Sequence, residues 1–166
     1  MAVILIGGGA RSGKSRFALE RLRAVQGSRA FVATAQAFDE EMTARIARHR
    51  TERGSEFSTI EEPLELARVI AASKFDMMIV DCLTLWLSNI MFAGRDCHAE
   101  AEALAHAAQA AAGTVIFVTN EVGCGIVPEN ALAREFRDRA GFLNQRMAAI
   151  ADEVYFMAFG LPLRMK

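Results

Sequence analysis

A glycine-rich stretch near the N-terminus constrains the fold of this chain more than any other feature. Residues 8–15 read Gly-Gly-Ala-Arg-Ser-Gly-Lys-Ser and fit the pattern G-x-x-x-x-G-K-[ST]. The stretch follows an apolar run, 2–6, typical of a buried strand, and it opens a helical pattern over 14–25. In that context backbone N–H groups and a helix N-terminus form a nest for anionic oxygens. We therefore predict a phosphate-binding loop, in which Lys14 reaches the β- and γ-phosphates and the Ser15 hydroxyl ligates Mg²⁺.

Short apolar runs alternate with helical patterns along the rest of the chain. We predict strands over 2–6, 29–33, 75–80, 114–118, 154–158 and 161–165, and helices over 14–25, 39–53, 64–72, 83–92, 99–112 and 129–151. Continuously apolar strands that are each followed by a helix indicate a mostly parallel sheet with helices on both faces, an α/β fold. No linker interrupts the pattern, so we expect a single domain over residues 1–166. In the last helix, we expect Leu132, Phe136, Leu143, Met147 and Ile150 to share one face.

Polar residues just after the strands are the first candidates for chemistry, because parallel sheets bind ligands beyond the carboxyl ends of their strands. Asp81 ends the apolar run 77–80, as expected of a carboxylate that holds a metal ion or its water. It also precedes a helix, so a role as helix N-cap is the alternative. Residues 119–121, Thr-Asn-Glu, are candidates for sensing the γ-phosphate or positioning a nucleophile. For the glycine-bearing stretch 122–130 that follows, a plain loop and helix cap is the alternative.

Composition excludes several other classes. The chain is 52% apolar and 23% charged with a net charge of −1, which is unlike a disordered protein and argues against nucleic acid as the main partner. No apolar run approaches the roughly 18 to 20 residues that span a bilayer, and no basic region precedes residues 2–6 to make a secretory signal. The cysteines, Cys82, Cys97 and Cys124, exclude a C-x-x-C pair and suit a reducing cytosol.

The motif of guanine-reading GTPases is missing. Residues 120–123 read Asn-Glu-Val-Gly where N-K-x-D is required, and Asp81 is followed by Cys-Leu-Thr, which lacks the D-x-x-G of a second switch. A DNA-handling ATPase is disfavoured by the charge balance and the small size. A small-molecule kinase remains on pattern alone.

The predicted helix over 39–53 is mostly polar. Its thin apolar stripe, Met42 and Ile46, continues to His49, which has four arginines nearby. One interpretation is an amphipathic surface helix with a half-buried histidine. The other is a nucleophilic histidine in an arginine-lined phosphate site, where neutral imidazole attacks an α-phosphorus to form a phosphoramidate. The residues alone leave both open, whereas His98 and His106 lie in an Ala-rich helix and are expected at the surface.

These blocks together resemble the family of bifunctional adenosylcobinamide kinase/adenosylcobinamide-phosphate guanylyltransferases of cobalamin biosynthesis. The phosphate loop is generic, but the His-bearing stretch 39–50 and the Asn-Glu-Val-Gly block at 120–123 are specific to that family. The matching stretches extend nearly end to end and include 8–15, 33–35, 39–50, 61–63, 81–84, 119–130 and parts of 134–154. Cys124 stands where the family usually has Met. Because cysteine is the smaller residue, we expect little functional change from this difference. The stretch 94–112 matches poorly.

The resemblance implies a RecA-like P-loop NTPase fold and two reactions. ATP or GTP first phosphorylates the aminopropanol hydroxyl of adenosylcobinamide. GTP then loses pyrophosphate to form a GMP–histidine at His49, and the GMP passes to adenosylcobinamide phosphate, giving adenosylcobinamide-GDP. The implied nucleotide-binding residues are Gly8, Gly9, Ala10, Arg11, Ser12, Gly13, Lys14, Ser15, Ala33, Thr34, Ala35, His49, Arg50, Thr51, Glu52, Glu61 and Asp81. The resemblance also implies Mg²⁺ bound at Ser15 and Asp81, a cytoplasmic location and a homotrimer.

Two other functions stay open at this point. One is a monofunctional kinase of another small alcohol, in which His49 is structural. The other is a regulatory module that binds a nucleotide without turning it over.

Overall fold

The strand that leads into the phosphate loop is the fifth in a sheet of seven. The computed structural model describes residues 1–36 and 57–166, and in these the strand order is β3-β2-β4-β5-β1-β6-β7. The strands are β1 Val3–Gly8, β2 Arg29–Ala33, β3 Ser58–Glu61, β4 Met77–Asp81, β5 Thr114–Val118, β6 Glu153–Ala158 and β7 Leu161–Arg164. The helices of the same residues are α1 Lys14–Arg23, α3 Leu66–Ala71, α4 Leu83–Phe92, α5 Cys97–Ala110 and α6 Ala131–Ile150. Neighbouring strands from β3 through β6 pair in parallel, and β7 returns antiparallel to β6.

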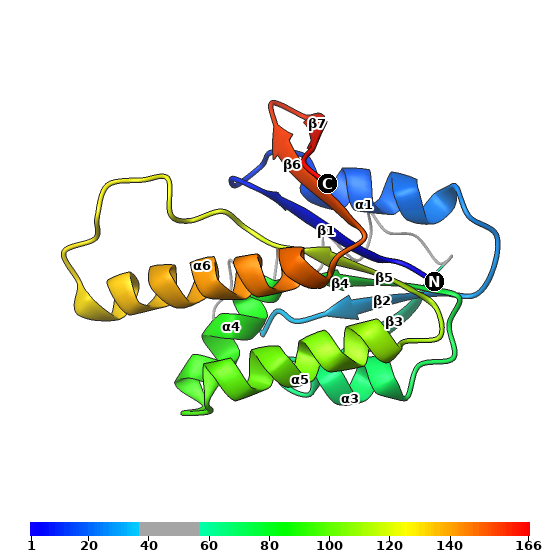
Figure 1. The fold of residues 1–166 in the computed structure, drawn as a ribbon, viewed down its shortest axis with the longest axis horizontal. Helices are drawn as coiled ribbons and strands as arrows, with labels where there is room; N and C mark the ends of the chain where they lie inside the picture. The colour runs from blue at the N-terminus through cyan, green and yellow to red at the C-terminus, as the bar shows by residue number, and fades with distance from the viewer. Residues whose placement is uncertain (37–56) are drawn as a thin grey trace.

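Helices cover both faces of the sheet (Figure 1). The alternation of side chains along β1 shows why, since Val3 and Leu5 join one buried cluster and Ile4 and Ile6 join the other. The first cluster includes residues of α3, α4, α5 and α6, whereas the second includes Ala18 and Leu22 of α1. β1 is apolar along its length because both of its faces are buried. The predicted α/β arrangement with a mostly parallel sheet is confirmed.

Most predicted elements occur, with shifted ends. The predicted bounds of β2, α4 and β5 agree with the structure. β3 was not predicted, because Ser58, Thr59 and Glu61 are exposed and only Ile60 packs toward the core. Leu132 lines the same cavity as Phe136 on α6, but it is 51% exposed, whereas Leu143 and Met147 on the predicted face are buried. The predicted helix over 39–53 lies outside the described residues.

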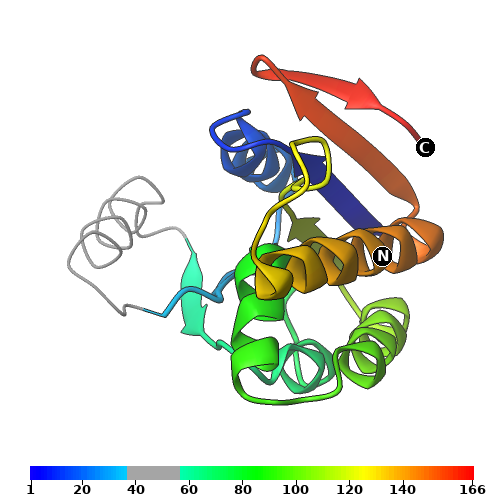
Figure 2. The ribbon, with the colours of Figure 1, turned by 90° about the vertical axis from the view of Figure 1, so that its left-hand side faces the viewer.

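The carboxyl ends of the parallel strands form one edge of the molecule. Figure 2 looks toward this edge, at which the phosphate loop, the loop before α6 and the tip of the hairpin β6–β7 lie. Within residues 1–36 and 57–166, no helix combines the length and the hydropathy needed to cross a bilayer.

Candidate functional site

The phosphate loop (residues 8–15) is shaped by glycines. Gly8 has φ +146°, and a Cβ atom there would lie 2.6 Å from the carbonyl oxygen of Met157 on the neighbouring strand β6. Gly13, with φ +96°, is the residue from which α1 starts. Ser12 N–H closes a turn onto the carbonyl of Gly9 at 3.3 Å. The loop therefore curls over the end of β1 and meets the helix N-terminus, as predicted.

Lys14 is buried although it carries a charge. Only 7% of the residue is exposed, and its Nζ donates to the carbonyl of Gly9 at 2.5 Å and to Oγ of Ser12 at 3.4 Å. Burial lowers the pKa of Lys14 from its ordinary value, while the nearby Cys82 and Asp81 act in the opposite direction. Both hydrogen-bond acceptors are neutral, so an anionic group on the loop would find a desolvated cation at its centre.

Ser15 and Asp81 meet across the sheet. The Ser15 hydroxyl donates to Oδ2 of Asp81 at 2.7 Å. The two residues meet although β5 lies between β1, which precedes Ser15, and β4, which ends at Asp81. The alternative that Asp81 caps a helix is wrong, because the N-cap of α4 is Cys82. A hydroxyl and a carboxylate oxygen side by side are hard ligands of the kind that Mg²⁺ takes. No cluster of three or more His, Cys, Asp or Glu able to hold a metal occurs in residues 1–36 and 57–166, so such an ion would draw its other ligands from phosphate and water.

The pairing of neighbouring strands aligns the other predicted residues along the edge of the sheet. Ala33 pairs with Glu61 on one side and with Asp81 on the other, and Asp81 pairs with Val118, which pairs with Ile6 just before the phosphate loop. The structure thus brings the ends of β2, β3 and β4 to the same edge as the phosphate loop. His49, Arg50, Thr51 and Glu52 lie outside the described residues.

Thr34 and Asn89 fix the end of β2. The Thr34 hydroxyl accepts from the N–H of Cys82 and donates to its carbonyl, each at 2.8 Å. The side-chain amide of Asn89, buried in α4, donates to the carbonyls of Thr34 at 2.8 Å and of Pro63 at 3.1 Å. Sequence reasoning missed Asn89. The available signal was a side-chain amide in the mostly apolar helix α4.

Thr119 and Asn120, the candidate sensor residues, belong to a second polar network. Thr119 Oγ1 donates to Oδ1 of Asn144 at 2.7 Å, and Asn144 Nδ2 donates to the carbonyl of Asn120 at 3.3 Å. The N–H of Asn120 donates to Oγ1 of Thr84 at 2.7 Å. Thr84 and Asn144 lie in stretches that match the family, but no role was predicted for either. The network holds the backbone just beyond β5 between the phosphate loop and Asp81, which leaves the Asn120 side chain close to Cys82.

Burial and charge separate the three thiols. Cys82 is buried and its pKa is raised to about 11, mainly by burial and then by the charge of Asp81. Cys124 is exposed in the loop before α6, and Cys97 is half-buried. His98 and His106 are exposed on α5, as expected.

Comparison with known proteins identifies close relatives. The model of the family described as cobinamide kinase / cobinamide phosphate guanyltransferase matches residues 4–165. The chain is 45% identical over 167 residues to the bifunctional adenosylcobalamin biosynthesis protein CobP of Pseudomonas aeruginosa, which covers 98% of this chain and 96% of that protein. It is 40% identical over 181 residues to the bifunctional adenosylcobalamin biosynthesis protein CobU of Salmonella typhimurium, which covers 99% of both.

Solved structures of distant sequence share the fold. A Pyrococcus horikoshii protein studied as PH0250 has a TM-score of 0.58 at 8% identity, covering 99% of this chain and 86% of that one. An ATPase from the type III secretion system of pathogenic bacteria has a TM-score of 0.54 at 11% identity, covering 98% of this chain and 56% of that one. The fold is that of the P-loop NTPases, with the RecA-like feature that one strand, β5, separates β1 from β4.

Proposed function

Because the chain belongs to the cobinamide kinase / cobinamide phosphate guanyltransferase family, we propose that it catalyses both reactions of that family. It phosphorylates adenosylcobinamide with ATP or GTP, and it transfers GMP from GTP to adenosylcobinamide phosphate. The observation that carries the proposal is the contact of Ser15 with Asp81 at 2.7 Å beside the buried Lys14, since phosphoryl transfer needs these groups at one place.

In the kinase step the protein holds and neutralises a triphosphate. Backbone N–H groups of residues 8–15 bind the phosphate oxygens, and the Lys14 ammonium pairs with the β- and γ-phosphates. Ser15 and Asp81 would hold Mg²⁺, which supplies charge neutralisation on the phosphates. The aminopropanol hydroxyl of the substrate attacks the γ-phosphorus, and the nucleoside diphosphate leaves. Thr119 is buried with its hydroxyl on Asn144, so of the two candidate sensor residues we propose that Asn120 contacts the terminal phosphate.

In the guanylyltransferase step the same loop presents a different phosphorus. We propose that the His49 imidazole attacks the α-phosphorus of GTP, so that an N–P bond forms and pyrophosphate leaves. A phosphate oxygen of adenosylcobinamide phosphate then attacks this phosphorus and frees His49. The remaining nucleotide contacts that we propose are made by Ala33, Thr34, Ala35, Arg50, Thr51, Glu52, Glu61 and Asp81. The role of His49 rests on the resemblance to the family, because the residue lies outside the described part of the chain.

The proposal extends to the organisation of the enzyme. Residues 1–166 act as one catalytic domain, the active assembly is a homotrimer, and the protein works in the cytoplasm. The single domain follows from the uninterrupted sequence pattern, and the trimer and the location follow from the family resemblance. Subunit number is measured by light scattering of the purified protein, and an active monomer would contradict the trimer.

A labelling contrast tests the two reactions separately. With Mg²⁺, α-labelled GTP leaves acid-labile, alkali-stable label on the protein, and γ-labelled GTP leaves none. His49→Ala abolishes this label and retains phosphorylation of adenosylcobinamide, while Lys14→Ala impairs both reactions. His106→Ala, on the exposed side of α5, is the matched control and keeps the label.

Three outcomes would contradict the proposal. Label retained in His49→Ala moves the nucleophile to another residue. Diphosphate formation without any covalent nucleotide indicates the monofunctional kinase. Nucleotide affinity without turnover by any acceptor indicates the regulatory module.

A further inference from the structure

Side chains from two helices enclose the peptide group of Asn120. Its N–H donates to Oγ1 of Thr84 at 2.7 Å, and its carbonyl accepts from Nδ2 of Asn144 at 3.3 Å. Thr84 lies in the first turn of α4, and Asn144 lies in α6. Because β5 has already ended at Val118, the backbone groups of Asn120 are bonded by side chains of helices and not by a neighbouring strand.

The hydrogen bonds around Asn120 close into a ring. The carbonyl of Asn120 can only accept, so the Asn144 amide presents Nδ2 to it and Oδ1 to Thr119, whose hydroxyl donates at 2.7 Å. The proton of Thr119 is thereby used, and in the 3.5 Å contact between the two threonine hydroxyls Thr84 is the donor. The ring thus passes from the N–H of Asn120 through the two threonines and Asn144 to the carbonyl of Asn120.

The two threonines of this ring are buried polar residues. Only 9% of Thr84 and 3% of Thr119 are exposed. A buried hydroxyl costs free energy unless it is hydrogen-bonded, and complete bonding offsets that cost with a modest net gain in stability. A fully bonded buried network does, however, fix the positions of its members. The ring is therefore better suited to holding Asn120 in one conformation than to stabilising the fold.

Asn120 is held between the phosphate loop and the end of β4. The N–H of the next residue, Glu121, donates to the carbonyl of Gly8 at 3.1 Å, which ties the backbone beyond Asn120 to the first residue of the loop. On the other side, Nδ2 of Asn120 lies 4.0 Å from Sγ of Cys82, the residue after Asp81. A small rotation of the Asn120 peptide would therefore move its side-chain amide relative to both parts of the phosphate site.

We propose that Thr84 and Asn144 are positioning residues for the kinase reaction, because they hold the Asn120 amide toward the terminal phosphate of the nucleotide. The inference rests on the contact of Asn120 with that phosphate in the proposed function and extends it to two residues that act through Asn120. The γ-phosphorus is attacked in the kinase reaction, whereas His49 attacks the α-phosphorus in the guanylyltransferase reaction. Opening the ring therefore slows the first reaction and spares the second at saturating nucleotide.

Two substitutions of Thr84 separate its hydroxyl from its shape. Thr84→Val keeps the shape and loses the hydroxyl, whereas Thr84→Ser keeps the hydroxyl. Phosphorylation of adenosylcobinamide is measured with ATP and Mg²⁺, and the rate of labelling by α-labelled GTP is measured without an acceptor. We expect Thr84→Val to lower the kcat of phosphorylation by about 10- to 100-fold, since displacing a contacting group by about 1 Å has effects of this size. Its labelling rate at saturating GTP stays that of the parent, and Thr84→Ser retains both rates.

Nucleotide binding gives a second readout. Calorimetry on the full chain with Mg²⁺ compares β,γ-imido-ATP, which carries a terminal phosphate, with ADP, which lacks it. Thr84→Val is expected to weaken the binding of β,γ-imido-ATP severalfold and to leave that of ADP unchanged, because the proposed contact of Asn120 is with the terminal phosphate alone. Equal weakening of both ligands would show damage to the phosphate loop and would overturn the inference.

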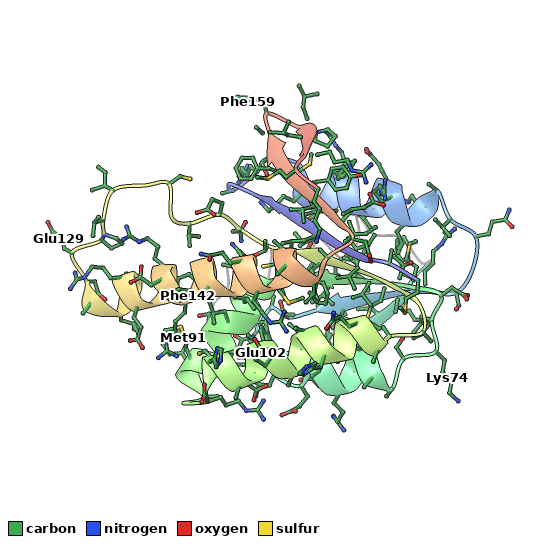
Figure 3. The ribbon with its side chains drawn as sticks, viewed as in Figure 1. Lys74, Met91, Glu102, Glu129, Phe142 and Phe159 are labelled. Atoms are coloured by element: carbon green, nitrogen blue, oxygen red, sulfur yellow. The ribbon has the colours of Figure 1, made fainter. Side chains whose placement is uncertain are left out.

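A second variant opens the ring from α6. Asn144→Ala removes the donor to Asn120 and the acceptor for Thr119, and it is expected to reproduce the loss of kinase activity. Because Asn144 is half-buried, this variant decides the question if Thr84→Val fails to fold. The matched control is Phe142→Ala, which removes a 70% exposed ring two positions earlier on the same helix (Figure 3) and keeps both activities.

The remaining outcomes separate the inference from the proposed function. The inference alone is overturned by parental kinase rates in folded Thr84→Val and Asn144→Ala, or by an equal loss of both reactions. A loss in Thr84→Ser as large as that in Thr84→Val overturns it as well, because the hydroxyl is retained there. If the parent protein phosphorylates no adenosylcobinamide, the proposed function fails together with the inference.

Discussion

The hydroxyl of Ser15 donates a 2.7 Å hydrogen bond to the carboxylate of Asp81, 66 residues further along the chain. Asp81→Asn keeps the shape of the side chain and an acceptor for Ser15 but removes the charge. We expect the kinase rate to fall by about 10²-fold or more and the Mg²⁺ concentration for half-maximal rate to rise, because a neutral amide is a poor ligand of a hard cation. The measurement is the phosphorylation rate over a Mg²⁺ titration. Asp138→Asn, on the exposed side of α6, is the control, and an unchanged titration in Asp81→Asn would exclude the metal role.

Two adjacent glycines of the phosphate loop differ in what a methyl group would meet. At Gly8 a Cβ atom would lie 2.6 Å from the carbonyl of Met157, whereas at Gly9 nothing lies within 4 Å. We expect Gly8→Ala to lower the free energy of unfolding by about 1–3 kcal/mol, because φ is +146° and the contact is with backbone. Gly9→Ala leaves stability close to that of the parent. Urea unfolding of the two variants measures this difference in the free energy of unfolding. Equal stabilities would contradict the steric explanation.

Asn89 joins two backbone segments through a single side-chain amide. Asn89→Ala leaves the carbonyls of Thr34 and Pro63 without this donor, and we expect the free energy of unfolding to fall by about 1–3 kcal/mol. In the sequence, Thr34 and Pro63 lie on either side of the proposed nucleophile His49. We therefore expect the substitution to weaken the guanylyltransferase reaction more than the binding of pyrophosphate. Ser88→Ala, one position earlier in α4, is the matched control. A variant with parental stability and activity would show that water replaces the amide.

Burial of Cys82 predicts an unreactive thiol in the folded protein. Its pKa is raised to about 11, so almost no thiolate forms near neutral pH, whereas the exposed Cys124 is open to reagents. We expect iodoacetamide at pH 8 to label Cys124 in the native protein and Cys82 only after unfolding. Peptide mapping of the labelled sites is the measurement. Cys124→Ser should remove the fast-reacting site.

The same pKa makes stability depend on pH in a defined direction. The thiol ionises near its ordinary value of 9.0 in the unfolded chain but only near 11 in the folded one. The folded state therefore holds the proton longer, and the free energy of unfolding falls as the pH rises through this window. Cys82→Ala is expected to flatten that part of the profile. A parallel decline in both proteins would assign it to other groups.

The phosphate loop and the class of the sheet could be predicted because they are local signals. A glycine pattern between a strand and a helix determines the backbone conformation of the loop locally. Continuous apolar runs such as the one before Asp81 are required wherever a strand is covered on both faces. The ends of elements were less accurate. Leu132 fits the period of α6, but it lies in the first turn of the helix and is 51% exposed.

Other parts of the site depend on contacts that no local pattern records. β3 has exposed residues at three of its four positions and is a strand only because β2 lies beside it. That Asp81 is not a helix cap follows from the start of α4, whose N-cap is Cys82. Its contact with Ser15 depends on the order of β1, β5 and β4. Asn89, Thr84 and Asn144 act through backbone groups far away in sequence, so their roles emerge only in three dimensions.

The strand order has a consequence for biosynthesis of the chain. β1 is made well before both of its neighbours, which are β5, whose residues begin at Thr114, and β6, whose residues begin at Glu153. Asp152 Oδ2 also accepts from the N–H of Val3 at 2.7 Å, which ties β1 to a residue 149 positions further along the chain. A nascent chain that stops before Thr114 therefore contains the whole glycine motif and Asp81 but neither of the strands that pair with β1. Affinity for nucleotide should arise late in synthesis and in one step.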